Sequence, residues 1–395
     1  MEFVDELADG AKGAALPLIR ADLHLDYGQV GLLIAVPLLV GGLLELPLGL
    51  VAGRGGRRHL LVLAGGVLVT ASLAAVAVSR SLGALMAAFV AFFPAAGAFV
   101  SLTEAALMDA APGRRQQRMA AWNLAGSVGA VGGPVLLAVV LTLGGTWRSA
   151  YLLLAAAAAA AVCAAVFAGP ASPANSLPEP ASVGSGSAGS GAEREDGRRP
   201  TVRQALAALG EGETARWLAL LQIGDLLLDV LTGYVGIYLV DVAHASPALA
   251  AIGVAIRLGG RLVGDGAFVV ISRVVSGRTA VAASAVAALA LYPAFLLAGP
   301  LAAKLAILAV LSAVTACWYP AMQAGLYDSL PGHSDIAVFL SSAASLAGAI
   351  GPLAVGFLAQ RTGLGWALAA MAAAPADVLV LLPRPGASRS RRVLR

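Results

Sequence analysis

The sequence predicts an all-α polytopic membrane protein in which two six-helix bundles are parallel repeats of one another. The prediction rests on the composition, on the length of the apolar runs and on a similarity between the two halves of the chain. Of the 395 residues, 59% are hydrophobic and 12% are charged, and the mean hydropathy is +0.85. Soluble domains contain about a quarter charged residues, so this chain has too little polar surface to remain in water.

Apolar runs long enough to span a bilayer as a helix, about 20 residues, recur along the chain. The twelve helices that we expect lie at 3–20, 29–52, 60–79, 82–109, 119–143, 148–169, 215–240, 247–272, 279–298, 301–329, 335–360 and 364–383. Their number and their low charge place the chain in the class of α-helical membrane proteins.

The two sets of six helices are separated by a stretch of different composition. Residues 170–204 read PASPANSLPEPASVGSGSAGSGAEREDGRRPTVRQ and are rich in Pro, Ser, Gly and charge. Such a segment cannot bury a core and is typical of a flexible linker. We therefore expect an N-terminal bundle at 1–169, a linker at 170–214 and a C-terminal bundle at 215–395 that ends in a short basic tail.

Positive charge gathers on one side of the predicted bundles. Arginines follow the second, fourth and eighth predicted helices and fill the linker and the tail: Arg54, Arg57, Arg58, Arg114, Arg115, Arg118, Arg194, Arg198, Arg199, Arg203, Arg273, Arg278, Arg384, Arg389, Arg391, Arg392 and Arg395. The opposite loops hold mostly single basic residues. Because loops rich in Lys and Arg face the cytoplasm, we expect the linker and both termini to be cytoplasmic. The expected location is the cell (inner or plasma) membrane.

The two halves align with a nearly constant shift. A shift of 220 pairs Asp5 with Asp225, Asp9 with Asp229 and Gly13 with Gly233, and a shift of 219 pairs Asp109 with Asp328, Gly129 with Gly348 and Trp147 with Trp366. Internal repeats of this kind are common in transporters. We infer that the halves are parallel repeats.

The repeat also bears on the start of the chain. Asp225 falls about ten residues into its predicted helix, roughly 15 Å along the axis, which is near the middle of a membrane. Asp5 should lie equally deep, yet only four residues precede it. Either the chain as given lacks the first part of the first helix or that helix is short, and we favour the former. The alternative is that Glu2, Asp5 and Glu6 form a frayed cytoplasmic end.

Polar residues inside the predicted spans are candidates for a transport pathway. A charged side chain at the centre of a membrane helix costs about 2.5–3.5 kcal/mol on insertion scales, so it should face an interior cavity. The candidates for substrate binding and proton coupling are Asp5, Asp9, Glu45, Glu104, Gln222, Asp225, Asp229, Arg257, Arg261 and Asp265. Asp225 and Asp229 share a helical face, because residues four apart are neighbours on a helix. Arg261 can pair with Asp265 one turn further on.

A purely structural role for these charges is the competing interpretation. The arginines and acids would then neutralise one another and hold the bundle together, which suits Arg261, Asp265 and Glu45 best. Asp9 and Asp229 favour a cavity, because Lys12 is the one basic residue within a turn of either. Burial favours the protonated form of a carboxyl group, as a proton carrier requires. His and Cys do not accompany the acids, so no metal site is expected.

Two helices carry glycines next to proline at corresponding positions of the repeat. They are Gly129, Gly132, Gly133 and Pro134 in the fifth predicted helix, and Gly348, Gly351 and Pro352 in the eleventh. Small residues let membrane helices approach closely, and Gly and Pro permit bending. We expect both packing and hinge roles here.

Residues 49–58, GLVAGRGGRR, resemble the motif that the major facilitator superfamily carries between its second and third helices. Gly49, Arg54, Gly56, Arg57 and Arg58 match that motif, which the resemblance identifies as a cytoplasmic gate, whereas Gly53 replaces its aspartate. Residues 126–134, GSVGAVGGP, look like the glycine-proline motif of antiporters. More narrowly, residues 16–33, LPLIRADLHLDYGQVGLL, are similar to the segment joining the first two helices of fosmidomycin-resistance-type exporters.

The resemblance implies a secondary active transporter that uses alternating access and no cofactor. Its driving force would be an ion gradient, most simply of protons, and its action the export of a small organic molecule. The halves of such proteins rock around a site near the midplane. The acidic residues favour a cationic or zwitterionic substrate, whereas Arg257 and Arg261 favour an anionic one, and the sequence leaves both open. We expect a monomer whose partners are the substrate and the lipid bilayer, without nucleic acid.

Two alternatives remain at this level, and two other classes are not expected. An importer of a sugar or organic acid would have the same fold, and a sensor or scaffold without transport activity would fit the replacement of the gate aspartate by Gly53. A membrane enzyme would need a clustered His/Asp or Ser/His/Asp site, which the sequence does not show, so we do not expect an enzyme. A nucleotide-driven pump would need a P-loop ending in Lys and Ser or Thr, which GRGGRR lacks.

Overall fold

The computed structural model describes residues 1–52, 58–109, 115–168, 210, 212–330, 340, 344 and 348–383. Within this part of the chain the side chains of residues 42, 45–52, 58, 59, 101, 102, 104–109, 115–120 and 229 are excluded from the description. The predicted linker, apart from its last residues, and the basic tail lie outside it. Their roles as linker and tail therefore stay predictions.

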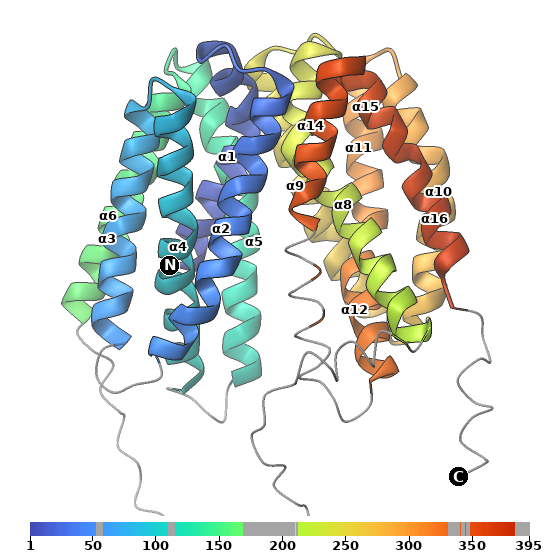
Figure 1. Ribbon diagram of the computed structural model, residues 1–395, viewed down its shortest axis with the longest axis horizontal. Helices are drawn as coiled ribbons and strands as arrows, with labels where there is room; N and C mark the ends of the chain where they lie inside the picture. The colour runs from blue at the N-terminus through green and yellow to red at the C-terminus, as the bar shows by residue number, and fades with distance from the viewer. Residues whose placement is uncertain are drawn as a thin grey trace, which may run out of the picture.

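The first half is a bundle of long helices whose bounds lie within a few residues of those expected. They are α1 (Glu2–Asp22), α2 (Tyr27–Ala52), α3 (Arg58–Val78), α4 (Leu82–Asp109), α5 (Arg115–Thr142) and α6 (Trp147–Ala168). In Figure 1, α1 begins about midway between the two ends of the bundle. The expectation that a further helical segment precedes residue 1 stays a prediction.

The second half repeats this arrangement with more interruptions. It contains α8 (Gly212–Asp241), α9 (Pro247–Ile271), α10 (Gly277–Leu297), α11 (Leu301–Thr315), α12 (Trp318–Ser329), α14 (Ile350–Thr362), α15 (Leu364–Ala370), the 3₁₀ turn η2 (Met371–Ala373) and α16 (Ala374–Leu381). In the eleventh expected helix, at 335–360, the residues before 348 lie mostly outside the described part.

Two helices that were predicted to be continuous remain single apolar spans, Leu301–Ser329 and Leu364–Leu381, but each contains a local break in its α-helical hydrogen bonding. The helix expected at 301–329 is divided into α11 and α12, and the one expected at 364–383 is divided by η2. A proline lies close to each break and has no N–H to donate to the carbonyl four residues earlier, although α1, α4, α5 and α10 continue through a proline. Pro320 therefore leaves the carbonyl of Ala316 without its helical partner, and Pro375 does the same to Met371.

The turns confirm that the halves are parallel repeats. His24 and His244 both have positive φ, 52° and 54°, and stand 220 residues apart. Gly144 and Gly363, with φ of 81° and 87°, stand 219 residues apart. Non-glycine residues seldom adopt this conformation, so its recurrence at both of the shifts found in the sequence is a strong sign of one repeated unit.

The two bundles stand side by side in Figure 1, with α1–α6 in blue to green and α8–α16 in yellow to red. Helices α1, α2 and α5 face the second half, where they pack against α8, α14 and α9. Within the described residues, eight helical segments are long and apolar enough to cross a membrane. A shorter apolar helical stretch, Tyr27–Gly41, lies in α2.

At one end of the molecule the halves are joined by polar contacts that we call the latch. Arg20 near the end of α1 forms an ion pair with Asp241, the last residue of α8. The hydroxyl of Tyr27 donates to the same carboxylate at 2.9 Å, and the Arg20 guanidinium lies 4.2 Å from the centre of the Tyr27 ring. The backbone N–H of Tyr27 donates to the side chain of Gln360 at 3.0 Å.

The latch defines the two ends of the molecule. At the latch end, at the top of Figure 1, α1 ends and α2 begins; at the opposite end, which we call the linker end, α6 ends and α8 begins. The sequence analysis did not single out the latch. Arg20 and Asp241 nevertheless stand 221 residues apart, close to the shift of the repeat, so they occupy nearly equivalent places in the two halves.

We predict that Asp241→Asn opens the latch end. The substitution removes an ion pair whose partners are about a quarter exposed, and such a contact contributes about 1–2 kcal/mol. This corresponds to a roughly five- to thirtyfold lower ratio of closed to open molecules. Spin labels at Leu23 and Ala243, in a protein with Cys163 and Cys317 replaced, should report longer and broader distances between the halves.

Asp22→Asn is the control for this experiment. Asp22 pairs with Arg148 at 2.6 Å near the same end, but both residues belong to the first half. Its substitution should leave the distance between the halves unchanged. Equal distance distributions for Asp241→Asn and the unaltered protein would refute the role of the latch.

Candidate functional site

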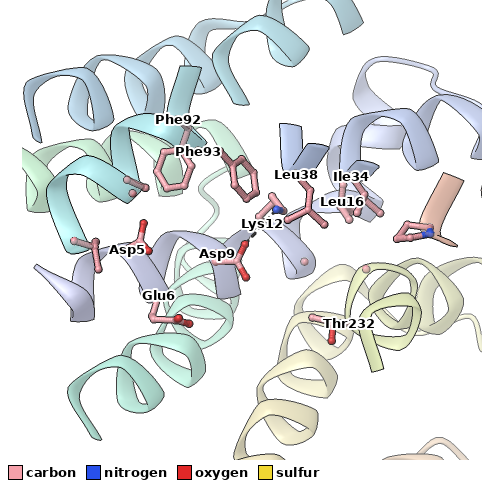
Figure 2. Close-up of a pocket in the computed structure, with 16 residues that line it drawn as sticks. Asp5, Glu6, Asp9, Lys12, Leu16, Ile34, Leu38, Phe92, Phe93 and Thr232 are labelled. Carbon is pink, nitrogen blue, oxygen red and sulfur yellow. Dashed lines mark ion pairs between the residues drawn. The ribbon is translucent and has the colours of Figure 1, made fainter. Parts of the chain in front are cut away.

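A cavity of about 390 Å³ lies between the two halves. Its polar wall comes from α1 and its apolar wall mainly from α2 and α4 (Figure 2). The lining residues are Asp5, Glu6, Asp9, Lys12, Gly13, Leu16, Ile34, Leu38, Phe92, Phe93, Ala96, Gly97, Val100, Thr232, Gly233 and Pro352. The cavity therefore combines three carboxyl groups and one amine with a hydrophobic surface.

The carboxyl groups reach the cavity because of their spacing on α1. Residues three and four apart lie on one face of a helix, so Asp5, Asp9 and Lys12 follow one another along the cavity. Glu6 leaves α1 on the other side from Asp5, toward α5, in Figure 2. It interacts electrostatically with Asp5, Asp9 and, from the second half, Arg261.

The depth of these groups is set by the close contact of α1 with α5. A Cβ atom added at Gly133 would overlap the carbonyl oxygen of Leu7 and the backbone nitrogen of Ala11, and one at Gly129 would overlap the carbonyl of Phe3. Glycine at these positions therefore lets the two helix backbones touch, as the sequence suggested for packing. In the second half, a Cβ atom at Gly351, the counterpart of Gly132, would overlap the side chain of Leu226 in α8.

Lys12 and Asp9 form an ion pair on the polar wall. The Lys12 Nζ atom lies 3.1 Å from Asp9 Oδ1, as the sequence spacing allowed. The same ammonium lies 4.7 Å from the ring centre of Phe93 and 5.9 Å from that of Phe89, both in α4. The Asp9 side chain is 53% exposed and that of Lys12 is 17% exposed, so the carboxylate is open to the cavity while the amine lies against α4.

Thr232 is the polar group that α8 contributes. Its hydroxyl donates to the carbonyl of Leu228 at 2.7 Å and accepts a hydrogen bond of 2.7 Å from the guanidinium of Arg257. Arg257 also donates to the carbonyl of Leu228. With 2% of its surface exposed, this arginine lies behind the cavity wall and ties α9 to α8.

The structure brings together only some of the predicted site residues. Asp5 and Asp9 line the cavity, whereas Gln222, Asp225, Arg257, Arg261 and Asp265 do not. Arg261 and Asp265 form the expected pair, at 3.8 Å, with both side chains about half exposed.

Other predicted residues are only partly described. Glu45 and Gly49 belong to α2, Glu104 to α4, Asp229 to α8 and Arg58 to α3, but their side chains are excluded from the description, and Arg54, Gly56 and Arg57 lie outside it altogether. The proposed gate motif is therefore untested.

The glycine and proline pairs lie at contacts between helices. A Cβ atom at Gly132 would meet one methyl group of Leu7 at 3.1 Å, and Pro134 follows in the same helix. In the second half, Gly348 faces Gln222, and the carbonyl of Pro352 accepts a hydrogen bond from the buried hydroxyl of Tyr234 at 2.8 Å. These contacts support the packing role of the glycines and prolines, while their hinge role stays a prediction.

The sequence analysis missed several lining residues. Glu6 was named only in the alternative of a frayed cytoplasmic end, and Phe92, Phe93 and Thr232 were not identified. The repeat contained a signal for Thr232, because a shift of 220 pairs it with Lys12. The two phenylalanines carried no such signal, since an aromatic residue in an apolar helix looks the same in sequence whether it faces lipid, core or cavity. Among the side chains described, no three His, Cys, Asp or Glu residues are placed to hold a metal ion.

Comparison with known proteins identifies the class. Residues 2–334 match the family model of the Major Facilitator Superfamily, and the chain belongs to this superfamily of membrane transporters. No match is found among curated protein sequences.

Solved transporters share the fold across almost the whole chain. A bacterial homolog to the human lysosomal transporter Spinster, in an inward-facing and unoccupied conformation, is 12% identical with a TM-score of 0.74, over 96% of this chain and 94% of that one. The nucleoside transporter NupG is 13% identical with a TM-score of 0.72, over 96% and 95%. At these identities the likeness establishes the fold of a two-domain, twelve-helix transporter.

We predict that Gly133→Ala destabilises the protein by about 1–3 kcal/mol, the usual cost of overpacking. The added methyl group must separate the backbones of α1 and α5. Gly132→Ala makes the same chemical change one residue away, where the neighbour is a flexible side-chain methyl. The melting temperature in detergent should therefore fall clearly for Gly133→Ala and little for Gly132→Ala, and equal falls would contradict the packing described here.

Proposed function

We propose that this transporter is a secondary active exporter that exchanges protons for a small organic molecule by alternating access. The observation that carries the proposal is the cavity between the halves, with three carboxyl groups on α1 beside an apolar wall. Ionisable groups inside a membrane are costly and mark substrate or proton pathways. Carboxyl groups can take up and release protons, so the same wall can serve both substrate and coupling ion.

The latch supports the alternating-access part of the proposal. Alternating access requires the two halves to close one end while the other gives access to the central site. Contacts between the halves join the latch end, through Arg20, Tyr27 and Asp241. We infer that the cavity is reached from the linker end in this conformation. The Spinster homolog of the same fold is described in inward-facing states.

The orientation in the membrane is part of the same proposal. The arginine-rich loops predict that the linker end and both termini face the cytoplasm of a cell membrane. Under that topology the conformation is open to the cytoplasm, as an exporter must be to load its substrate. The narrower similarity of residues 16–33 to fosmidomycin-resistance-type exporters also favours export.

A proton on Asp9 is the simplest coupling step. In the ion pair between Asp9 and Lys12, the side chain of Asp9 is the more exposed. When Asp9 is deprotonated, its carboxylate can bind a positively charged group of a substrate. When it is protonated, that charge is gone and the substrate leaves more readily. Proton and substrate then compete for one carboxylate, which makes their movements opposite in direction.

The test uses inside-out membrane vesicles with an imposed proton gradient and a pH-sensitive dye. A panel of cationic, zwitterionic and anionic compounds is added to the full chain and to Asp9→Asn. We expect one class of compound to dissipate the gradient, and the rate to fall roughly tenfold in the variant, the effect of losing about 1.4 kcal/mol of charge-assisted binding. Asp22→Asn, outside the cavity, should behave as the unaltered protein.

If no compound dissipates the gradient while the protein is inserted and folded, proton-coupled export is wrong. Accumulation of the same compounds in intact cells would then identify an importer. Failure of both assays would favour a protein that has kept the fold without transport.

A further inference from the structure

The surroundings of the Lys12 ammonium resemble a binding site for an organic cation. One carboxylate, that of Asp9, contacts it at 3.1 Å, and the rings of Phe93 and Phe89 lie within 6 Å. Proteins recognise ammonium ligands with this combination of negative charge and aromatic faces. Here the cation is a side chain of the protein itself.

Lys304 shows what a structural lysine looks like in this protein. Its ammonium also lies near two rings, but it donates to the hydroxyl of Tyr238 at 2.9 Å and to the carbonyls of Phe295 and Leu296 at 2.9 and 2.8 Å. A lysine ammonium has three donors, and Lys304 uses all of them. It caps the end of α10 at the latch end, away from the cavity.

The Lys12 ammonium has fewer polar partners than that of Lys304. Among the described residues its one polar partner is the Asp9 carboxylate, and its other contacts are with ring faces. Both kinds of contact can be made equally well by another ammonium group. The Asp9 carboxylate, 53% exposed, is accessible to such a group from the cavity.

The rest of the cavity suits the remainder of a cationic ligand. Leu16, Ile34, Leu38 and Phe92 provide an apolar surface next to the carboxylates. The lining side chains include three acids and one base, so the site favours a cation over an anion even when one acid is protonated. A volume of about 390 Å³ has room for a molecule with a single aromatic ring and a short ammonium arm.

We propose that Lys12 occupies the ammonium subsite of this cavity when no substrate is bound, and that the substrate is an apolar organic ammonium that displaces Lys12 from Asp9 and Phe93. The inference rests on the proposed function in one respect, that this cavity is where the substrate binds. Lys12 then acts as a built-in competitor. It balances the charge of Asp9 while the site is empty, and it sets the affinity that a cationic substrate must exceed.

The test measures binding to the purified full chain by isothermal titration calorimetry, without a proton gradient. The probes are benzyltrimethylammonium, its uncharged carbon analogue neopentylbenzene, and the anion phenylacetate. Removing the competitor in Lys12→Met should tighten binding of benzyltrimethylammonium roughly tenfold. Lys12→Arg keeps a competitor that pairs more firmly with a carboxylate and should weaken it. The opposite signs distinguish displacement from a loss of folding.

Two further variants define the subsite. Phe93→Leu removes a ring face and should weaken binding of benzyltrimethylammonium more than binding of neopentylbenzene. Lys304→Gln is the control, because this lysine lies outside the cavity, and it should leave the affinity for all three probes unchanged. Thermal melting confirms that each variant is folded.

The inference fails if Lys12→Met leaves the affinity for benzyltrimethylammonium unchanged or lowers it. It also fails if phenylacetate is the tighter ligand and Lys12→Met abolishes its binding, since Lys12 would then anchor an anion. These results are independent of proton coupling. Binding that follows the expected order in a protein without proton exchange would support the subsite and reject the proposed driving force.

Discussion

The charged face of α1 is the constraint on which the rest of the structure depends. Carboxyl groups and an amine in the middle of a membrane protein must be kept away from lipid and balanced by neighbours. The Gly129 and Gly133 contacts hold α1 directly against α5, and the second half covers its other side. The result is a cavity whose polar wall is a single helix, with an apolar wall contributed by α2 and α4.

The two halves place positive charge beside the cavity in different ways, although they are repeats. In the first half Lys12 faces Asp9 across one turn of α1 and lies on the rings of α4. At the equivalent place in the second half stands Thr232, and the positive charge comes from Arg257 on another helix, buried behind the wall. The asymmetry leaves one cation, Lys12, in the lining of the cavity and another, Arg257, buried behind its wall.

The latch and the cavity are connected through α1. Arg20 lies near one end of this helix, at the contact with Asp241, and the lining residues from Asp5 to Leu16 precede it along the same rod. A movement of α1 against α8 therefore changes the latch and the cavity together. Helix α1 continues through Pro17 between the two regions, so it joins them directly, and such a coupling would serve the alternating access proposed above.

The sequence by itself determined the class, the helices and the repeat. Apolar runs of bilayer length permit few structures other than helices, because every backbone polar group must be satisfied within the segment. It also marked Asp5 and Asp9, since charge in such runs is rare. Pro320 and Pro375 were visible, but whether a proline bends, breaks or merely occupies a membrane helix depends on its neighbours.

Only the tertiary structure decided which of the polar residues meet. Arg257 and Asp9 were both predicted from the sequence to line a transport pathway, yet one is buried against a backbone carbonyl and the other faces a cavity. The aromatic faces beside Lys12 and the latch join segments that are distant along the chain. Such contacts depend on helix rotation and packing, which are set by the whole bundle and leave no local pattern to find.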